Sequence, residues 1–166
     1  MTKNEFYFSS ANQKARMRAV EWIPEGEPKA VIYLFHGSSG TACRYEELAS
    51  FFTEHGFVVI ENAHSGQEEL HACLTVIKKT YPDVPCLLLG CSGGVPLVYS
   101  FVKENPDAVE GIVLADSGQE SHLLKKNIPL LQVSGVEKNC QEVFHHIYHW
   151  TEERLDEMLY QAATKQ

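Results

Sequence analysis

Hydrophobic and polar positions follow two patterns that alternate along the whole chain. Short apolar runs, rich in β-branched and aromatic residues, predict strands over residues 6–8, 16–23, 30–35, 57–60, 86–89, 109–115 and 130–133. Between them, apolar residues at helical spacing predict helices over residues 44–55, 67–80, 95–102 and 152–163. The clearest helix is 67–80, in which four apolar residues form one stripe: Leu70, Cys73, Leu74 and Ile77.

The last helix, over residues 152–163, is predicted to have Thr151 as its N-cap, because threonine is common at that position and two acidic residues follow it. Just upstream, the stretch "VFHHIYH" fits either an alternating strand or a helical turn and a half. The pattern alone leaves residues 136–150 open between these two interpretations.

Strands that alternate with helices are typical of a mostly parallel sheet with helices on both faces. The sequence therefore predicts an α/β protein, arranged as a three-layer α/β/α sandwich. The 166 residues are enough for one hydrophobic core and few for two. We therefore expect a single domain over residues 1–166.

Charge and composition narrow the classes of function. The net charge of −8 argues against nucleic acid or an anionic membrane as a partner bound through bulk charge. No apolar run approaches the roughly 18 residues of a membrane span, and the first residues lack the apolar segment of a secretory signal. The five cysteines are odd in number and irregularly spaced. Reduced thiols and a cytoplasmic location are therefore expected.

One short stretch carries candidate chemistry. Gly90-Cys91-Ser92-Gly93-Gly94 lies between a predicted strand and a predicted helix, as the G-x-S-x-G nucleophile elbow requires. The serine of such an elbow sits on a sharp turn with its Oγ above the sheet, and side chains at Gly90 or Gly94 would collide with their neighbours. Ser92 is the candidate nucleophile, whereas Cys91 is interpreted as a small buried residue.

A nucleophile elbow also needs donors for an oxyanion. The backbone N–H of Gly93 is one candidate, because it follows the nucleophile directly. The other is the backbone N–H of Ser38, since the strand over 30–35 ends in His36-Gly37-Ser38 and Gly37 allows a close backbone approach. His36 itself is interpreted as a structural histidine, because the expected donors are backbone groups.

These features together resemble the α/β-hydrolase superfamily, and within it the monoacylglycerol lipase and lysophospholipase branch. The resemblance rests on "AVEWIPEGEPKAVIYLFHGSSG", "RYEELASFFTEHGFVVIENAHS", "YPDVPCLLLGCSGG", "VEGIVLADS" and "IPLLQVSG", in that order over roughly residues 5–135. It implies a carboxylic ester with an acyl chain as the small-molecule substrate, and no cofactor.

The chain differs from that branch in the segment that forms a helical cap over the active site in the branch. Only "DSGQESHLLKKNIP" joins the two strands that usually flank a helical cap. A lid excludes water and shapes an acyl pocket. We therefore expect an open, lidless site that favours short or medium acyl chains, and apolar surface that a homodimer could cover.

The expected base is a histidine that follows the nucleophile in the chain. His149 fits best, just before the predicted N-cap Thr151, and His146 and His145 are alternatives within a short register error. His145 and His149 also have i, i+4 spacing, but the Glu of H-E-x-x-H and a third ligand are missing, which argues against a metal site.

The acid that would orient the histidine is less clearly placed. The resemblance implies an Asp in the turn after "QVSG", but that turn holds Glu137 and Asn139 instead. Asp116, at the end of the preceding strand, is slightly favoured over Glu137, and it could also bond loop N–H groups. A serine–histidine dyad without an acid would still hydrolyse its substrate, at a measurable rate.

The sequence therefore predicts a serine carboxylesterase. The main alternative is a non-catalytic derivative of the fold that acts as a binding module or scaffold. A thioesterase or an amidase would use the same acyl-transfer chemistry.

Overall fold

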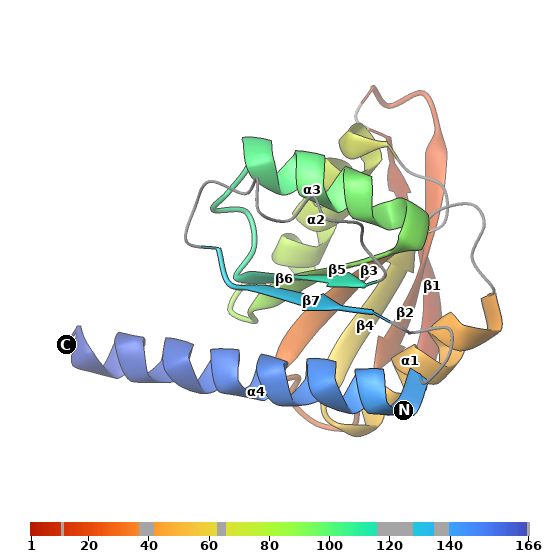
Figure 1. Cartoon of the computed structure of the whole chain (residues 1–166). Coiled ribbons are helices and arrows are strands. Elements are labelled where there is room, and N and C mark those ends of the chain that lie inside the picture. The colour runs from red at the N-terminus through yellow and green to blue at the C-terminus, as the bar shows by residue number, and fades with distance from the viewer. Residues whose placement is uncertain (11, 37–41, 63–65, 116–127, 135–139, 166) are drawn as a thin grey trace.

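The computed structural model describes residues 1–10, 12–36, 42–62, 66–115, 128–134 and 140–165. In this part of the chain the strands are β1 (Thr2–Ser9), β2 (Arg16–Ile23), β3 (Ala30–His36), β4 (Phe57–Asn62), β5 (Cys86–Cys91), β6 (Gly111–Ala115) and β7 (Leu130–Val133). The helices are α1 (Ala42–Glu54), α2 (Gln67–Thr80), the short 3-10 helix η1 (Ser92–Gly94), α3 (Val95–Glu104) and α4 (Cys140–Thr164) (Figure 1).

The strands form one seven-stranded sheet in the order β1-β2-β4-β3-β5-β6-β7. From β4 to β7 all neighbours are parallel, whereas the β1–β2 hairpin is antiparallel and joins the sheet through β2 and β4. The central strands β5 and β6 are buried along their whole length, which explains their unbroken apolar runs. The predicted mostly parallel α/β fold is confirmed.

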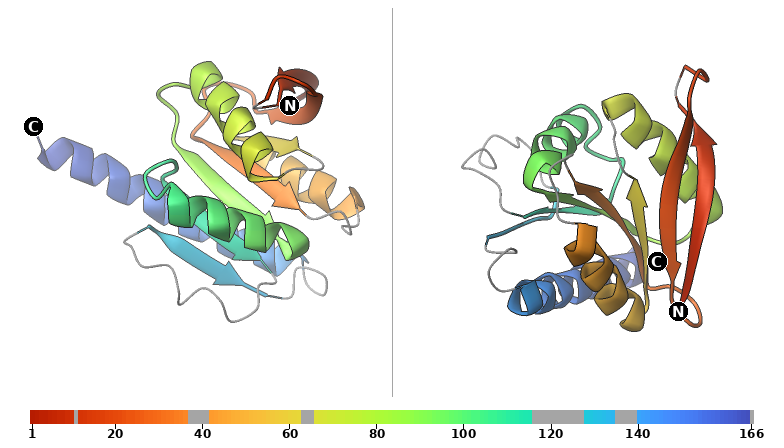
Figure 2. Two further views of the ribbon diagram at one scale, coloured as in Figure 1. Left: turned by 90° about the horizontal axis from the view of Figure 1, so that it is seen from above. Right: turned by 90° about the vertical axis from the view of Figure 1, so that its right-hand side faces the viewer.

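Helices cover both faces of the sheet. α2 and α3 lie over one face, and α1 and α4 lie over the other (Figures 1 and 2). The core between the sheet and α2 and α3 includes Tyr33 and Phe101. The core on the opposite face includes Ile32, Phe52 and Phe144. Alternate residues of β3 therefore support opposite layers, as strand geometry requires.

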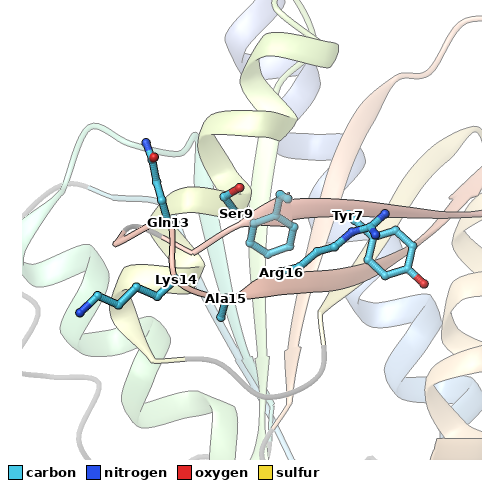
Figure 3. A pocket seen from close by; sticks show the side chains of 7 residues that line it. Tyr7, Ser9, Gln13, Lys14, Ala15 and Arg16 are labelled. Carbon is cyan, nitrogen blue, oxygen red and sulfur yellow. The ribbon is translucent and has the colours of Figure 1, made fainter.

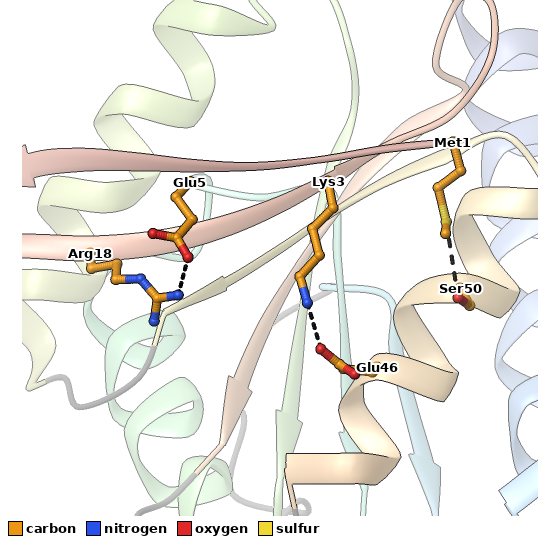
Figure 4. A network of polar contacts seen from close by, with 6 residues as sticks. All are labelled: Met1, Lys3, Glu5, Arg18, Glu46 and Ser50. Carbon is orange, nitrogen blue, oxygen red and sulfur yellow. Dashed lines mark hydrogen bonds and ion pairs between the residues drawn. The ribbon is translucent and has the colours of Figure 1, made fainter.

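The outer strand β1 is tied down by polar contacts (Figure 4). Nζ of Lys3 lies 2.5 Å from Oε1 of Glu46 on α1, and Arg18 on β2 pairs with Glu5. All four side chains are about half exposed, so water and salt weaken the attraction within each pair. Their effect is to hold the edge of the sheet against α1 and β2.

Most predicted elements match the structure. The bounds 16–23, 67–80 and 130–133 agree in full, and the stripe Leu70, Cys73, Leu74 and Ile77 is buried as predicted. The predicted start of the last helix at residue 152, with Thr151 as its N-cap, is wrong, because α4 already begins at Cys140. Thr151 is buried within the helix, and its Oγ1 donates to the carbonyl oxygen of Ile147 at 2.8 Å. "VFHHIYH" is therefore helical.

The earlier start of α4 has a packing cause. Val143, Phe144 and Ile147 are buried at helical spacing against the α1 side of the sheet.

Within the described residues, none of the helices is both long and apolar enough to cross a membrane.

Candidate active site

Ser92 follows the carboxyl end of β5 directly and opens the turn into α3. Its φ of +46° lies in the left-handed region, which costs a non-glycine residue about 1 kcal/mol or more. Its side chain is exposed. The chain thus holds a serine on a strained strand-to-helix turn, near the positive end of the α3 dipole.

The glycines on either side of Ser92 have a steric explanation. A Cβ on Gly94 would lie 2.1 Å from the carbonyl oxygen of Phe35 and 3.1 Å from Cα of His36. A Cβ on Gly90 would lie 3.1 Å from Cγ2 of Val98 on α3. The elbow is therefore wedged between the end of β3 and the first turns of α3, and Gly94 permits the closer approach.

A carboxylate–imidazole pair lies beside the elbow. Nε2 of His36, the last residue of β3, is 2.6 Å from Oε1 of Glu61 on β4. The His36 ring also stacks on Tyr45 of α1, with 4.2 Å between ring centroids. The side chains of His36 and Glu61 are 13% and 20% exposed. Both partners are thus largely shielded from water.

Sequence reasoning assigned His36 a structural role and did not consider Glu61. A usable signal was present, since polar residues end two otherwise apolar strands, "YLFH" and "VVIEN". The carboxyl ends of parallel strands meet at the same edge of a sheet, where α/β proteins bind their ligands. Neighbouring strands that end in a histidine and a glutamate therefore predict a polar pair at that edge.

Several of the predicted site residues lie outside the described residues. They are the oxyanion candidate Ser38, the neighbouring Gly37 that was expected to allow a close backbone approach, and the acid candidates Asp116 and Glu137. Their assigned roles stay predictions. Gly93, the other oxyanion candidate, lies in η1 directly after Ser92.

The structure does not bring His149 to Ser92. His149 was expected in a loop before a helix, but it lies inside α4, about 14 Å along the helix axis from Cys140. The alternatives His145 and His146 lie on the same helix with exposed side chains.

The neighbours of His149 identify the edge of the sheet at which it lies. The Tyr148 ring is 6.2 Å from that of Phe57, the first residue of β4. Nζ of Lys29, the residue just before β3, donates a hydrogen bond to Oε1 of Glu152 at 2.7 Å. These are the amino ends of the parallel strands, whereas Ser92 follows a carboxyl end. Six residues of β5 separate the two edges by about 20 Å.

Two further features were considered as sites. Among the residues that the structure describes, no three His, Cys, Asp or Glu side chains cluster so that they could hold a metal ion. A hollow near the turn of the β1–β2 hairpin is lined by Tyr7, Phe8, Ser9, Gln13, Lys14, Ala15 and Arg16 (Figure 3). It is separated from β5 by β4 and β3 in the strand order, so it is distinct from the elbow.

The sequence was compared with protein-family models and with curated proteins. No family model matches the chain. In an alignment of 110 residues it is 31% identical to the mouse (Mus musculus) monoglyceride lipase, and the match covers 56% of this chain and 36% of that relative. The chain thus spans well under half of the curated relative.

Solved structures extend the likeness to nearly the whole chain. A cold-adapted esterase from an Arctic intertidal metagenomic library superposes with a TM-score of 0.71 at 14% identity, covering 92% of this chain and 93% of that one. A Xanthomonas campestris α/β serine hydrolase described as lacking a lid gives a TM-score of 0.65 at 13% identity, covering 82% and 72%. The chain is therefore an α/β-hydrolase in fold, related in sequence over its matched stretch to the monoglyceride lipases.

Proposed function

We propose that the chain is a serine hydrolase that cleaves carboxylic esters, with Ser92 as the nucleophile. The observation that carries this proposal is the strained, exposed Ser92 on a tight turn between β5 and α3. A serine at such a turn projects its Oγ toward solvent, where an acyl group can reach it. The related lipases and esterases support ester hydrolysis as the general reaction.

The reaction would follow acyl-transfer chemistry. Oγ of Ser92 bonds to the ester carbonyl carbon as its proton passes to a base, and the carbonyl oxygen becomes an oxyanion. The backbone N–H groups of Gly93 and Ser38 are proposed to hold that oxyanion. The intermediate expels the alcohol, which takes up the proton, and leaves an acyl-enzyme. Water then repeats the two steps, releasing the acid and free Ser92.

Short or medium acyl chains are the proposed substrates. The sequence between β6 and β7 is too short for the helical cap that the resemblance implies. An open site gives a long acyl chain little apolar surface to bury, so each added methylene contributes less binding than in a covered pocket.

The single domain, the homodimer and the cytoplasmic location stay predictions.

The test compares wild type with Ser92→Ala on p-nitrophenyl acetate, butyrate and palmitate. We expect Ser92→Ala to lower kcat/KM by about 10³-fold or more, and the acetate and butyrate esters to exceed the palmitate ester. Ser100→Ala, on α3, is the matched control and should stay near wild type. Fluorophosphonate labelling of wild type but not of Ser92→Ala would identify the nucleophile directly.

A second candidate function is a non-catalytic derivative of the fold. The position of His149 at the amino edge of the sheet favours it, because a serine without a base is a weak nucleophile. Hydrolysis by wild type at the rate of Ser92→Ala, together with no fluorophosphonate labelling, would select this second candidate.

A further inference from the structure

Positive charge is concentrated in the β1–β2 hairpin. The first 18 residues hold four lysines and arginines against one glutamate, whereas the rest of the chain holds 10 against 21 acidic residues. The net charge of −8 therefore combines a positive hairpin with a strongly negative body. Charge asymmetry of this kind indicates an anionic partner that only one part of the chain contacts.

Two of the four hairpin cations, Lys14 and Arg16, are exposed and have no ion-pair partner among the described residues. The other two form the ion pairs with Glu46 and Glu5 described above. Arg16 lies over the ring of Tyr7, with 4.1 Å between its Cζ and the ring centroid (Figure 3). Both positive charges are therefore available to an anion from outside the chain.

A hollow of about 400 Å³ at the hairpin turn brings these cations together with further polar groups. We define the hairpin patch as five residues that line it: Tyr7, Ser9, Gln13, Lys14 and Arg16. The Ser9 hydroxyl and the Gln13 carboxamide add hydrogen-bond donors. The Tyr7 side chain is 49% exposed, and tyrosine rings are enriched where a membrane meets water.

The turn that carries Lys14 is held by hydrogen bonds. Oγ of Ser10 donates to Oδ1 of Asn12 at 2.7 Å and accepts the backbone N–H of Ala15 at 3.0 Å. Oδ1 of Asn12 also accepts the backbone N–H of Lys14 at 3.0 Å. Because the turn is already ordered, binding loses little conformational entropy in the backbone.

The hairpin turn lies at the same edge of the sheet as Ser92. Ala19 on β2 pairs with Asn62, the last residue of β4, and β4 runs parallel to β3 and β5. Arg16 is three residues further along β2, and therefore about 10 Å beyond the carboxyl end of β4. Figure 2 shows the hairpin turn above the end of β4 in its right-hand view. The hairpin patch thus projects past the edge on which Ser92 lies.

The separation between the hairpin patch and Ser92 decides what kind of partner fits. In the order β2-β4-β3-β5, three steps separate the strand of Arg16 from the strand before Ser92, which is about 14 Å across the sheet. A small anion in the hollow does not span this distance. A broad surface that lies against the carboxyl edge touches both places at once.

We propose that the hairpin patch binds phosphate groups of an anionic lipid surface and turns the edge that carries Ser92 toward that surface. This inference rests on the proposed function, which it deepens by naming where the acyl esters would be met. The Arg16 guanidinium suits paired hydrogen bonds to phosphate oxygens, and the Lys14 ammonium acts as a point charge. The Tyr7 ring lies at the level of the lipid headgroups.

The negative body does not prevent this contact at physiological salt. The Debye length is then about 8 Å, which is shorter than the distance of about 10 Å by which Arg16 extends beyond β4. Carboxylates close to this edge include Glu61, which pairs with His36, and Glu68 and Glu69 in the first turn of α2. Salt therefore screens their repulsion more than it screens the direct contacts of the hairpin patch.

Co-sedimentation of the full chain with sucrose-loaded vesicles tests the proposal. The vesicles contain either phosphatidylcholine alone or equal parts of phosphatidylcholine and phosphatidylglycerol, in about 0.15 M salt. We expect wild type to bind the anionic vesicles more tightly. Each cation at an anionic surface strengthens binding about 5-fold, so the double variant Lys14→Gln, Arg16→Gln should lose about 25-fold. Arg16→Lys keeps the charge and should lose less than Arg16→Gln.

The matched control removes two cations at the other edge of the sheet. Lys79 and Lys103 lie in the last turns of α2 and α3, and the double variant Lys79→Gln, Lys103→Gln should bind anionic vesicles as wild type does. Ser92→Ala should also bind as wild type, because binding does not require hydrolysis. Circular dichroism confirms that each variant is folded.

A second readout connects binding to hydrolysis. The rate on an acyl ester carried in anionic vesicles is divided by the rate on p-nitrophenyl butyrate in solution. This ratio should fall in the hairpin double variant and stay at the wild-type value in the matched control, because only the first ester requires contact with the lipid surface.

Three results would overturn the inference and leave the proposed function intact. The first is equal binding of wild type to the two kinds of vesicle, and the second is an equal loss of binding in the hairpin variant and the matched control. The third is weaker binding of inorganic phosphate in the hairpin variant with unchanged vesicle binding, which would assign the hollow to a soluble anion. If Ser92→Ala hydrolyses esters at the wild-type rate, the proposed function itself fails, whatever the vesicles show.

Discussion

Gly94 and Phe35 define the closest approach in the elbow, because a Cβ on Gly94 would lie 2.1 Å from the carbonyl oxygen of Phe35 and 2.7 Å from its carbonyl carbon. Both atoms belong to the backbone of the buried strand β3, so neither can move aside cheaply. This contact joins the strand that ends in His36 to the turn that carries Ser92.

Substitution of Gly94 should therefore be more damaging than substitution of Gly90. We expect Gly94→Ala to lower the free energy of unfolding by about 3 kcal/mol and to abolish labelling of Ser92. Gly90→Ala meets mainly the side chain of Val98, with Cγ2 at 3.1 Å, and should cost about 1 kcal/mol. Urea denaturation measures both, and equal stability losses would contradict the explanation.

The continuity of α4 can be tested with proline. If a helix began at Thr151, proline at position 152 would occupy the first helical position and be tolerated. In α4 the same change removes an internal hydrogen bond, and we expect Glu152→Pro to cost about 3 kcal/mol. Glu152→Ala is the control, because it removes the ion pair with Lys29 but keeps the helix. Loss of far-UV helical signal in the proline variant alone would agree with a continuous α4.

The Lys29–Glu152 pair should contribute a small, pH-dependent stability. The hydrogen bond from Lys29 to Glu152 raises the pKa of the Lys29 ammonium above its usual range. The folded state therefore holds that proton more tightly than the unfolded state. The contribution is fully present below the pKa of an unfolded lysine, about 10.4, and is lost as pH rises through the folded pKa.

Side chains that are 45% and 32% exposed limit this contribution to about 1 kcal/mol or less. A double-mutant cycle with Lys29→Met and Glu152→Gln, measured by urea denaturation at pH 8 and at pH 11, isolates the pair. A coupling energy that grows between the two pH values would contradict the assignment.

Tyr81 links the end of α2 to β2. Its hydroxyl donates to Oε1 of Glu21 at 2.6 Å, and burial, with help from Glu21, raises the pKa of Tyr81. Because hydrogen bonds to carboxylates are stronger than neutral ones, we expect Tyr81→Phe to destabilise the protein by about 1.5 kcal/mol. Tyr160→Phe is the matched control, since that ring is 72% exposed on α4, and its melting temperature should equal that of wild type.

The elements and the elbow could be predicted because they depend on local patterns. The stripe of α2, the apolar runs of β3 and β5 and the spacing Gly90-x-Ser92-x-Gly94 each lie within a few neighbouring residues. The start of α4 was missed because Thr151 and its acidic neighbours look like an N-cap. Burial of Val143, Phe144 and Ile147 against the sheet decides otherwise, and propensity is a weak guide where packing competes.

By itself, the sequence determined the alternation of strands and helices, and with it the fold class and the position of Ser92. Only the tertiary structure decided which polar side chains meet at the carboxyl edge of the sheet. His36 and Glu61 are 25 positions apart, and they meet because β3 and β4 pair in parallel. His149 was predicted to be the base for Ser92, but it lies in α4 near the amino ends of the strands. Contacts between distant residues depend on how strands and helices pack, which no local pattern records.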